Sequence, residues 1–103
     1  MEQSLDARKG GSQLSRIDEL REMIASIDKD IVELIATRME VADELGRAKK
    51  QAHSGYRNPE VESQVINRYL ELSQEVDISE DDARKIAETI LEISLARQKR
   101  ITE

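Results

Sequence analysis

The sequence of 103 residues predicts an all-α fold of three helices, one long, one short and one of medium length. Helix-forming residues dominate it, and it contains only 4 Gly and 1 Pro. Apolar residues recur at helical spacing in three stretches, and no stretch alternates as a β-strand would. Aromatic residues make up 2%, so a single layer of such helices buries little area. We therefore expect the chain to pack against a second copy of itself.

The first predicted helix runs from about residue 14 to 51 and carries a heptad seam. At 1.5 Å per residue it is roughly 55 Å long, so it must pack along another long helix. Residues 1–13 are predicted to form a flexible N-terminal tail, and residues 14–103 the helical domain. The seam consists of Ile17, Leu20, Ile24, Ile27, Ile31, Leu34, Arg38, Val41, Leu45 and Ala48.

Two shorter helices follow a break at residues 53–55. Asn58 and Pro59 are typical of an N-cap and of a first helical residue, and this helix is predicted to reach about Gln74. Ser79, with Asp82 three residues later, resembles a capping box for a third helix that ends near Ile101. The buried face predicted for the third helix carries Ala83, Ile86, Ala87, Ile90, Ile93 and Ile101.

Composition argues against several classes of function. The formal charge of −6 disfavours nucleic acid as a partner, because binding phosphates requires a concentrated basic surface. The sequence has 0 Cys and a single His, His53, so disulfides, thiolate sites and His-rich metal sites are not expected. No apolar run is long enough to span a membrane, and residues 1–9 do not resemble a secretory signal. These features predict a soluble cytoplasmic protein.

Two cations lie on one face of the long helix. Arg38 occupies a seam position where Ile or Leu is expected, and a buried guanidinium requires a partner or a polar cavity. Lys49 follows after a rotation of about 20° and a rise of about 16 Å. Arg21 lies about 25 Å from Arg38 and points about 100° away. One small dianion can therefore contact Arg21 and Arg38 only if a second, antiparallel chain donates Arg21.

These residues also have purely structural interpretations. Arg38 could specify helix register or pair with a Glu of another helix, and Lys49 could balance the dipole at a helix end. Ser94 and Gln98, four residues apart on the third helix, place polar groups on an otherwise apolar face. They could simply satisfy neighbouring polar groups.

The order of these residues resembles that of the all-helical (AroQ-type) chorismate mutases. The resemblance covers about residues 14 to 101. It is carried by Leu20-Arg21-Glu22 with Ile24, Ile27-Asp28, the run from Ile35 to Ala42, Gly46-Arg47-Ala48-Lys49, Asn58-Pro59-Glu60-Val61-Glu62, and Ser94 with Gln98. It implies an intertwined homodimer with two sites, each built mainly by one chain and completed by an Arg from the other.

The resemblance also implies the reaction and the residues that bind its substrate. The reaction is the rearrangement of chorismate to prephenate in phenylalanine and tyrosine biosynthesis, and it needs no cofactor and no metal. By resemblance, Arg38 and the partner's Arg21 bind the two carboxylates of chorismate, assisted by Ser94. Glu62 accepts a hydrogen bond from the ring hydroxyl, and Asn58 belongs to the substrate-binding set.

Lys49 and Gln98 are the catalytic residues that the resemblance implies, one on each side of the ether oxygen. Preorganised donors of this kind stabilise the negative charge that grows as the C–O bond breaks. Two positions depart from the family pattern. Asn58 replaces the usual Asp and keeps the N-cap role, whereas Val61 replaces an Arg, with Arg57 as a nearby substitute.

Three alternatives to the chorismate mutase interpretation stay open at this point. The same fold serves isochorismate-pyruvate lyases and aminodeoxychorismate mutases, which bind related dianions in a similar cationic pocket. The heptad seam alone also permits a non-catalytic helical dimerisation module. That module would pair Arg38 and Lys49 with acidic residues and leave no cavity between them.

Overall fold

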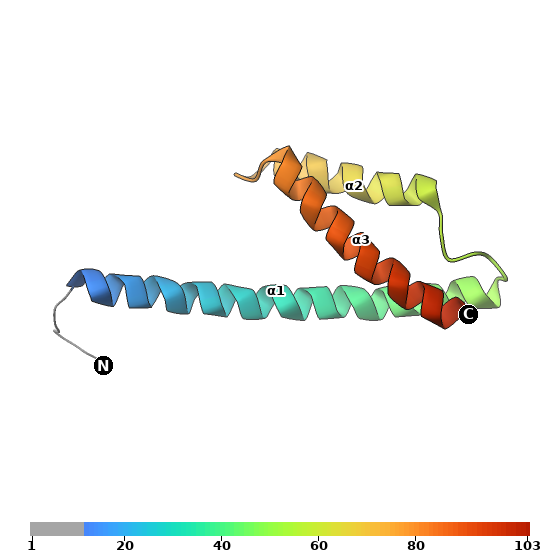
Figure 1. Ribbon diagram of the computed structural model, residues 1–103, viewed down its shortest axis with the longest axis horizontal. Coiled ribbons are helices and arrows are strands. Elements are labelled where there is room, and N and C mark those ends of the chain that lie inside the picture. Colours follow the sequence, from blue (N-terminus) through green and yellow to red (C-terminus); the bar gives the residue numbers. More distant parts are fainter. Residues whose placement is uncertain (1–11) are drawn as a thin grey trace. The chain divides into compact units, whose positions relative to one another are not determined.

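The protein consists of three α-helices over the residues that the structure, a computed structural model, describes, which are residues 12–103 (Figure 1). They are α1 (Ser12–Gln51), α2 (Pro59–Ser73) and α3 (Glu80–Thr102), and no strand occurs among these residues. The predicted all-α class and helix order are confirmed. Helix α1 begins two residues before its predicted start; residues 1–11 of the predicted tail lie outside the described residues.

The N-termini of α2 and α3 are capped as the sequence predicts. The Asn58 side chain accepts a hydrogen bond from the Val61 backbone N–H at 3.3 Å, and Pro59 is the first helical residue. The Ser79 hydroxyl accepts one from the Asp82 N–H at 3.1 Å. Each cap satisfies a backbone donor that the first turn of a helix leaves without a partner.

Helix α1 ends in a Schellman motif centred on His53. The His53 N–H donates to the Lys50 carbonyl at 3.1 Å, and the Ser54 N–H donates to the Lys49 carbonyl at 3.0 Å. His53 itself has a φ of 56°, in the left-handed region that usually holds Gly at this position. The motif ends α1 at Gln51, and its left-handed residue, His53, starts the loop that leads to α2.

The structure divides into two units within α1, one ending at Leu34 and one beginning at Ile35. In the first unit every side chain from Ser15 to Leu34 is exposed. This holds for the apolar seam as well, whose exposed fractions range from 40% to 70%. The exposed seam residues of this unit are Ile17, Leu20, Ile24, Ile27, Ile31 and Leu34.

The second unit, residues 35–103, contains the buried core. Its buried apolar side chains come from all three helices: Met39, Ala42, Val65, Ala83 and Ala87. These side chains are mostly small, so the helices approach closely. The expected buried face of α3 is confirmed at Ala83 and Ala87, but Ile86 and Ile93 are 45% and 43% exposed because no described part of the chain covers them.

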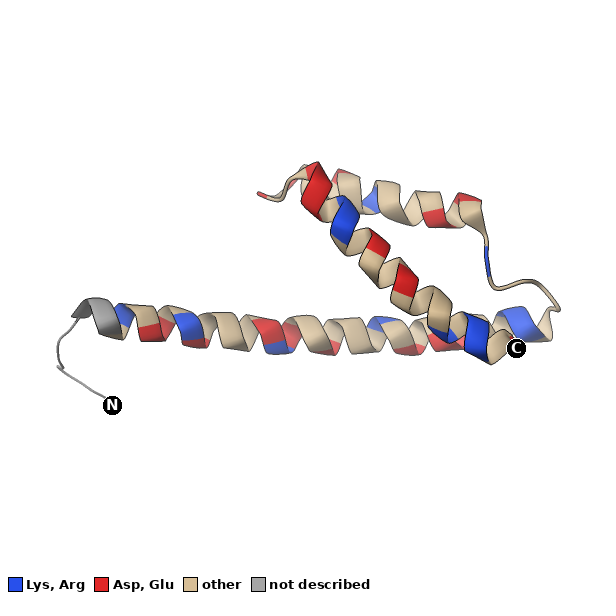
Figure 2. Ribbon diagram, in the orientation of Figure 1, with Lys and Arg blue, Asp and Glu red and all other residues tan. Residues whose placement is uncertain are grey.

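Charged side chains complement the dipole of α3 (Figure 2). Its first turn carries Glu80, Asp81 and Asp82, and its last turn carries Lys99 and Arg100. Acids near a helix N-terminus and bases near its C-terminus stabilise the helix.

None of the described helices is both long and apolar enough to cross a membrane. The cytoplasmic location expected from the sequence stays a prediction.

Candidate active site

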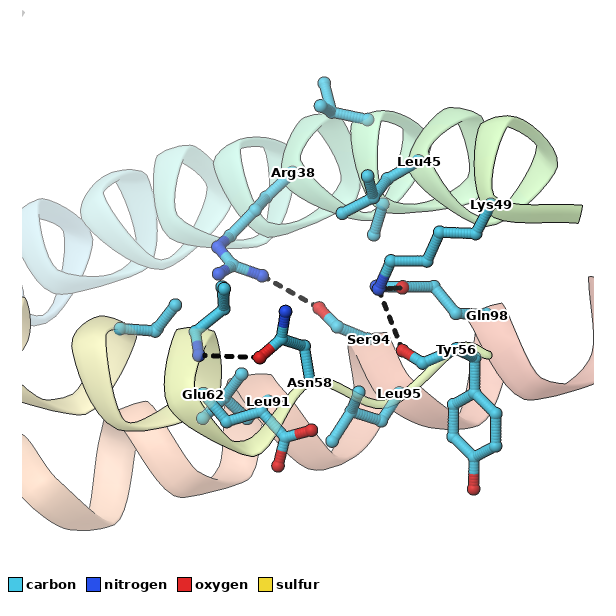
Figure 3. A pocket seen from close by; sticks show the side chains of 14 residues that line it. Arg38, Leu45, Lys49, Tyr56, Asn58, Glu62, Leu91, Ser94, Leu95 and Gln98 are labelled. Carbon is cyan, nitrogen blue, oxygen red and sulfur yellow. Dashed lines mark hydrogen bonds between the residues drawn. The ribbon is translucent and has the colours of Figure 1, made fainter. Parts of the chain in front are cut away.

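A cavity of about 250 Å³ lies within the second unit, between the C-terminal part of α1, the α1–α2 loop, α2 and α3 (Figure 3). Its size is slightly below the range of roughly 300–1,000 Å³ that is typical of small-molecule sites. Most of its wall is apolar and comes from Val41, Ala42, Leu45, Val65, Leu91 and Leu95. The polar side chains that face this apolar wall are few. Those of α1 and α3 form two separate groups, here called the first polar point (Arg38 and Ser94) and the second polar point (Lys49 and Gln98).

Arg38 and Ser94 form the first polar point. The Arg38 Nη1 donates to the Ser94 Oγ at 2.8 Å, across 56 positions of sequence. Ser94 is 2% exposed, and its hydroxyl also lies 3.5 Å from the Met39 sulfur. Arg38 is half-buried. In the hydrogen bond described for it, the guanidinium is held by a neutral hydroxyl, which does not neutralise the positive charge that an anion would meet.

Lys49 and Gln98 form the second polar point. The Lys49 Nζ donates to the Gln98 Oε1 at 2.8 Å and to the Tyr56 backbone carbonyl at 2.8 Å. Both acceptors are neutral, so they orient the ammonium without neutralising it. Because Gln98 accepts through its oxygen, its amide NH₂ is the group that can donate to a ligand.

Gly46 allows α1 and α3 to approach closely beside this second point. A Cβ at position 46 would lie 3.3 Å from the Gln98 Cα and 3.4 Å from the Gln98 Cγ. Any larger residue at this position would have to push Gln98 away from α1. Gly46 thereby contributes to the short contact between Lys49 and Gln98.

The third side of the cavity is the N-terminus of α2. Asn58 lines it with the same side chain that caps α2, and its amide nitrogen points into the cavity (Figure 3). Glu62, in the first turn, also lines it, and Arg57 binds the Glu62 carboxylate through a two-pronged ion pair. The hydrogen bonding from Arg57 is the largest cause, and it lowers the pKa of Glu62 below its ordinary value; desolvation by burial is the next largest and opposes it.

A second two-pronged ion pair joins α1 to α3 outside the cavity. The Arg97 Nε donates to the Asp43 Oδ1 at 2.8 Å, and the Arg97 Nη2 donates to the Asp43 Oδ2 at 2.7 Å. The hydrogen bond from Arg97 lowers the pKa of Asp43. Arg97 directly precedes Gln98, so this pair sets the register of α3 against α1 next to the second polar point.

Comparison with known proteins identifies the family to which this site belongs. A family model described as "Chorismate mutase type II" matches residues 20–99, most of the chain. The chain belongs to this family. A chorismate mutase of Methanocaldococcus jannaschii is 30% identical over 90 residues, which are 87% of this chain and 91% of that protein.

A longer relative also matches the chain. The bifunctional chorismate mutase/prephenate dehydratase of Escherichia coli strain K12 is 27% identical over 84 residues, which are 82% of this chain and 22% of that protein. The chain thus spans less than a quarter of this relative. No solved structure is significantly similar to the chain.

Membership of the chorismate mutase family makes the chain an isomerase and favours chorismate mutase over the lyase, aminodeoxychorismate mutase and non-catalytic alternatives. The cavity also differs from what a dimerisation module would require. Arg38 and Lys49 face a hollow, and the hydrogen bonds described for them go to neutral groups rather than to carboxylates.

The structure brings six of the seven predicted site residues to this one cavity. These are Arg38, Lys49, Asn58, Glu62, Ser94 and Gln98. Arg21 is not among the residues that line it. Val61, where the resemblance leads us to expect an Arg, lines the cavity with an apolar side chain.

Sequence reasoning missed two contributions to the site and underestimated a third. The Tyr56 backbone carbonyl, an acceptor for Lys49, has no signal in the sequence because every residue carries such a group. Gly46 belongs to a motif of the family resemblance, but its role in close packing depends on which residue lies opposite. Arg57 was expected only as a substitute cation, whereas it pairs with Glu62.

Proposed function

We propose that this cavity binds chorismate and catalyses its rearrangement to prephenate, a step in aromatic amino acid biosynthesis. The observation that carries the proposal is the pair of polar points on an apolar wall, each made of a cation held by a neutral side chain. This arrangement suits a compact apolar ring system that bears negative charges, because the cations keep their charge for the ligand.

Arg38 and Ser94 are proposed to bind one carboxylate of chorismate. A guanidinium offers two parallel N–H groups to a carboxylate, and the Ser94 hydroxyl can rotate to donate to the same group. Fixing a flexible dianion in its compact, reactive conformation lowers the barrier by removing the entropy of finding that conformation. The half-buried position of Arg38 strengthens the interaction by reducing solvent screening.

Lys49 and Gln98 are proposed to stabilise the transition state. In the rearrangement the ether C–O bond breaks while a C–C bond forms within the same molecule, so no atom enters or leaves and no proton is transferred. Negative charge grows on the ether oxygen. The Lys49 ammonium and the Gln98 amide NH₂ are already aimed by their mutual hydrogen bond, so little reorganisation is needed when that charge develops.

Glu62 and Asn58 are proposed to complete the binding of the ring. Glu62 accepts a hydrogen bond from the ring hydroxyl, a role that requires an ionised carboxylate. The pairing with Arg57 keeps it ionised, because it lowers the pKa of Glu62. Asn58 caps α2 through its oxygen and offers its amide nitrogen to the ligand.

We further propose that the enzyme is an intertwined homodimer in which Arg21 of the partner subunit supplies the cation for the second carboxylate. Two observations support this proposal. The apolar seam from Ile17 to Leu34 is exposed in the single chain, which is typical of a surface that another chain covers. The cations that line the cavity are Arg38 and Lys49, which are assigned to the first carboxylate and to the ether oxygen, so the second carboxylate requires a cation from elsewhere.

The test is to incubate the purified chain with chorismate, follow its disappearance and identify the product. Prephenate formed well above the uncatalysed rate is the expected result. If chorismate is not consumed while isochorismate or aminodeoxychorismate is, the chain has one of the two related activities. A folded oligomer that acts on none of the three would contradict the proposed function.

A further inference from the structure

Arg57 and Glu62 make the only two-pronged ion pair described at the cavity, and only Glu62 lines it. The Arg57 Nε donates to the Glu62 Oε2 at 2.9 Å, and the Arg57 Nη2 donates to the Glu62 Oε1 at 2.6 Å. The Glu62 side chain is 16% exposed and the Arg57 side chain is 55% exposed. The guanidinium therefore approaches the carboxylate from the solvent side and reaches the cavity only through it.

The carboxylate keeps acceptor capacity after this pairing. Two carboxylate oxygens offer about four lone-pair positions, and a two-pronged bond from one guanidinium uses two of them. A hydroxyl inside the cavity can donate to one of the remaining positions. Arg57 thus restricts the directions from which Glu62 can accept without blocking it.

The backbone on both sides of the ion pair is fixed. Arg57 directly precedes the Asn58 N-cap, whose carbonyl accepts from the Glu62 N–H at 3.0 Å and whose side chain accepts from the Val61 N–H at 3.3 Å. A planar, two-pronged contact between two such anchored residues holds a Glu side chain that would otherwise sample several rotamers. Val61 is apolar and cannot provide an alternative cation for this carboxylate.

We propose that Arg57 is a positioning residue: it fixes the Glu62 carboxylate in the orientation that accepts the ring hydroxyl of the substrate. This inference rests on the proposed function. It assigns Arg57 a different role from that of a replacement for the cation missing at position 61. Arg57 acts through Glu62 and has no contact of its own with the substrate.

The same pairing also acts on the charge of Glu62. The hydrogen bond from Arg57 is the largest cause that lowers the pKa of Glu62, and Lys49 of α1 contributes a smaller electrostatic effect. Arg38 is the other cation that lines the cavity from α1, Tyr56 is the titratable side chain from the loop, and the lining residues of α3 are not titratable. Removing Arg57 should therefore raise the pKa of Glu62 and move the acid limb of kcat/KM to higher pH.

The test is a double-mutant cycle on the full chain with Arg57→Gln, Glu62→Gln and both together, assayed with chorismate over a range of pH. Arg57→Gln is expected to lower kcat/KM about 10-fold, the usual effect of losing a hydrogen bond to a charged group. In the Glu62→Gln background the same change should have almost no further effect. Arg84→Gln, an exposed Arg of α3 outside the cavity, is the matched control and should change neither rate nor pH profile.

Arg57→Lys separates positioning from charge. Lys keeps the positive charge but cannot form the two-pronged bond, so the acid limb should move to higher pH by less than in Arg57→Gln, while kcat/KM stays lowered. Thermal melting by circular dichroism verifies that each variant is folded, and Arg57→Lys replaces Arg57→Gln in the cycle if the latter does not fold. An equal loss of kcat/KM in both backgrounds would overturn the inference and leave the proposed function intact. Inactivity of the unmodified chain would instead remove the proposed function itself.

Discussion

The segment from Ser15 to Leu34 and the segment from Ile35 to Glu103 contain parts of one heptad seam but differ in the exposure of their side chains. In the first segment all side chains are exposed, including six apolar seam residues. In the second, α1 has neighbours in α2 and α3, and the seam includes Arg38, which lines a cavity. The first is an apolar surface without a cover in the single chain, and the second is a core with a cavity.

A seam pattern therefore predicts which face of a helix is apolar, but not which chain covers that face. Six exposed seam residues in twenty consecutive positions are unfavourable in water, since each large apolar side chain gains about 1.5–3 kcal/mol on full burial. We infer that the first segment is stabilised by a second copy and the second by its own helices. The proposed enzyme needs both segments, the second for its cavity and the first for Arg21.

The largest effect is expected at the two cations of the second segment. Lys49→Ala and Arg38→Ala should each lower turnover of chorismate by about 100-fold or more, because each removes a preorganised charge from the site. Sedimentation and circular dichroism should show an unchanged oligomer with unchanged helix content. Near-normal turnover in either purified variant would contradict the site assignment.

The matched controls are Lys50→Ala and Arg47→Ala. Both residues are exposed on the same helix, close to the site residues in sequence but outside the cavity lining. Turnover within about twofold of the unmodified chain is expected for both, because the cost of removing an exposed charge is small. A large loss in these controls would mean that net charge, and not the cavity, determines activity.

The next largest effect is expected on the dissociation constant of the dimer, and it tests whether the first segment is an interface. Ile27→Lys should raise the dissociation constant of the dimer by about 100-fold or more, because two buried Ile side chains, one from each copy, would be lost. Ser26→Lys, an exposed neighbour off the seam, should leave the dimer intact. Analytical ultracentrifugation over a dilution series measures both constants. Equal effects of the two variants would mean that the seam is not an interface.

The smallest expected effects are changes in melting temperature at two ion pairs, one in each segment. The pKa of Asp43 is lowered by its hydrogen bond from Arg97, so this pair stabilises the fold above the ordinary Asp pKa of 3.8 and loses that effect as the pH falls through and below it. The difference in melting temperature between the unmodified chain and Asp43→Asn should therefore be largest near neutral pH and shrink below about pH 4.

The comparison pair in the first segment is Arg16 and Glu19. It is exposed on both sides and joined at 3.4 Å. Glu19→Gln should change the melting temperature little at any pH, since exposed ion pairs contribute at most about 1 kcal/mol. If the melting temperature depends on pH as strongly for Glu19→Gln as for Asp43→Asn, an ion pair that joins two helices stabilises the fold no more than an exposed pair within one helix.

Much of the fold could be predicted because it depends on local signals. The caps at Asn58 and Ser79 mark the starts of α2 and α3, and the seam marks α1. Burial on α3 was harder to predict. Ile86 and Ile93 belong to the apolar face but are exposed in the single chain, because periodicity does not indicate whether a neighbouring helix reaches a given turn.

The site was partly predictable for a related reason. Arg38 and Lys49 interrupt an apolar face at spacings that helix geometry converts directly into positions, and the structure places both on one cavity. The hydrogen-bond partners of the side chains at the site were not predictable. Whether Arg57 pairs with Glu62, and whether Tyr56 offers its carbonyl to Lys49, depends on the path of the loop between α1 and α2.

The central claim is that each active site combines the cavity of one chain with Arg21 of another, and mixing two inactive variants tests it most directly. Arg21→Ala and Arg38→Ala chains should each have little activity alone. After refolding together, random pairing should restore about a quarter of the sites, because half of the dimers are mixed and each holds one intact site. Recovery of chorismate turnover to that extent is expected if the sites are shared. No recovery in confirmed mixed dimers would contradict the shared site.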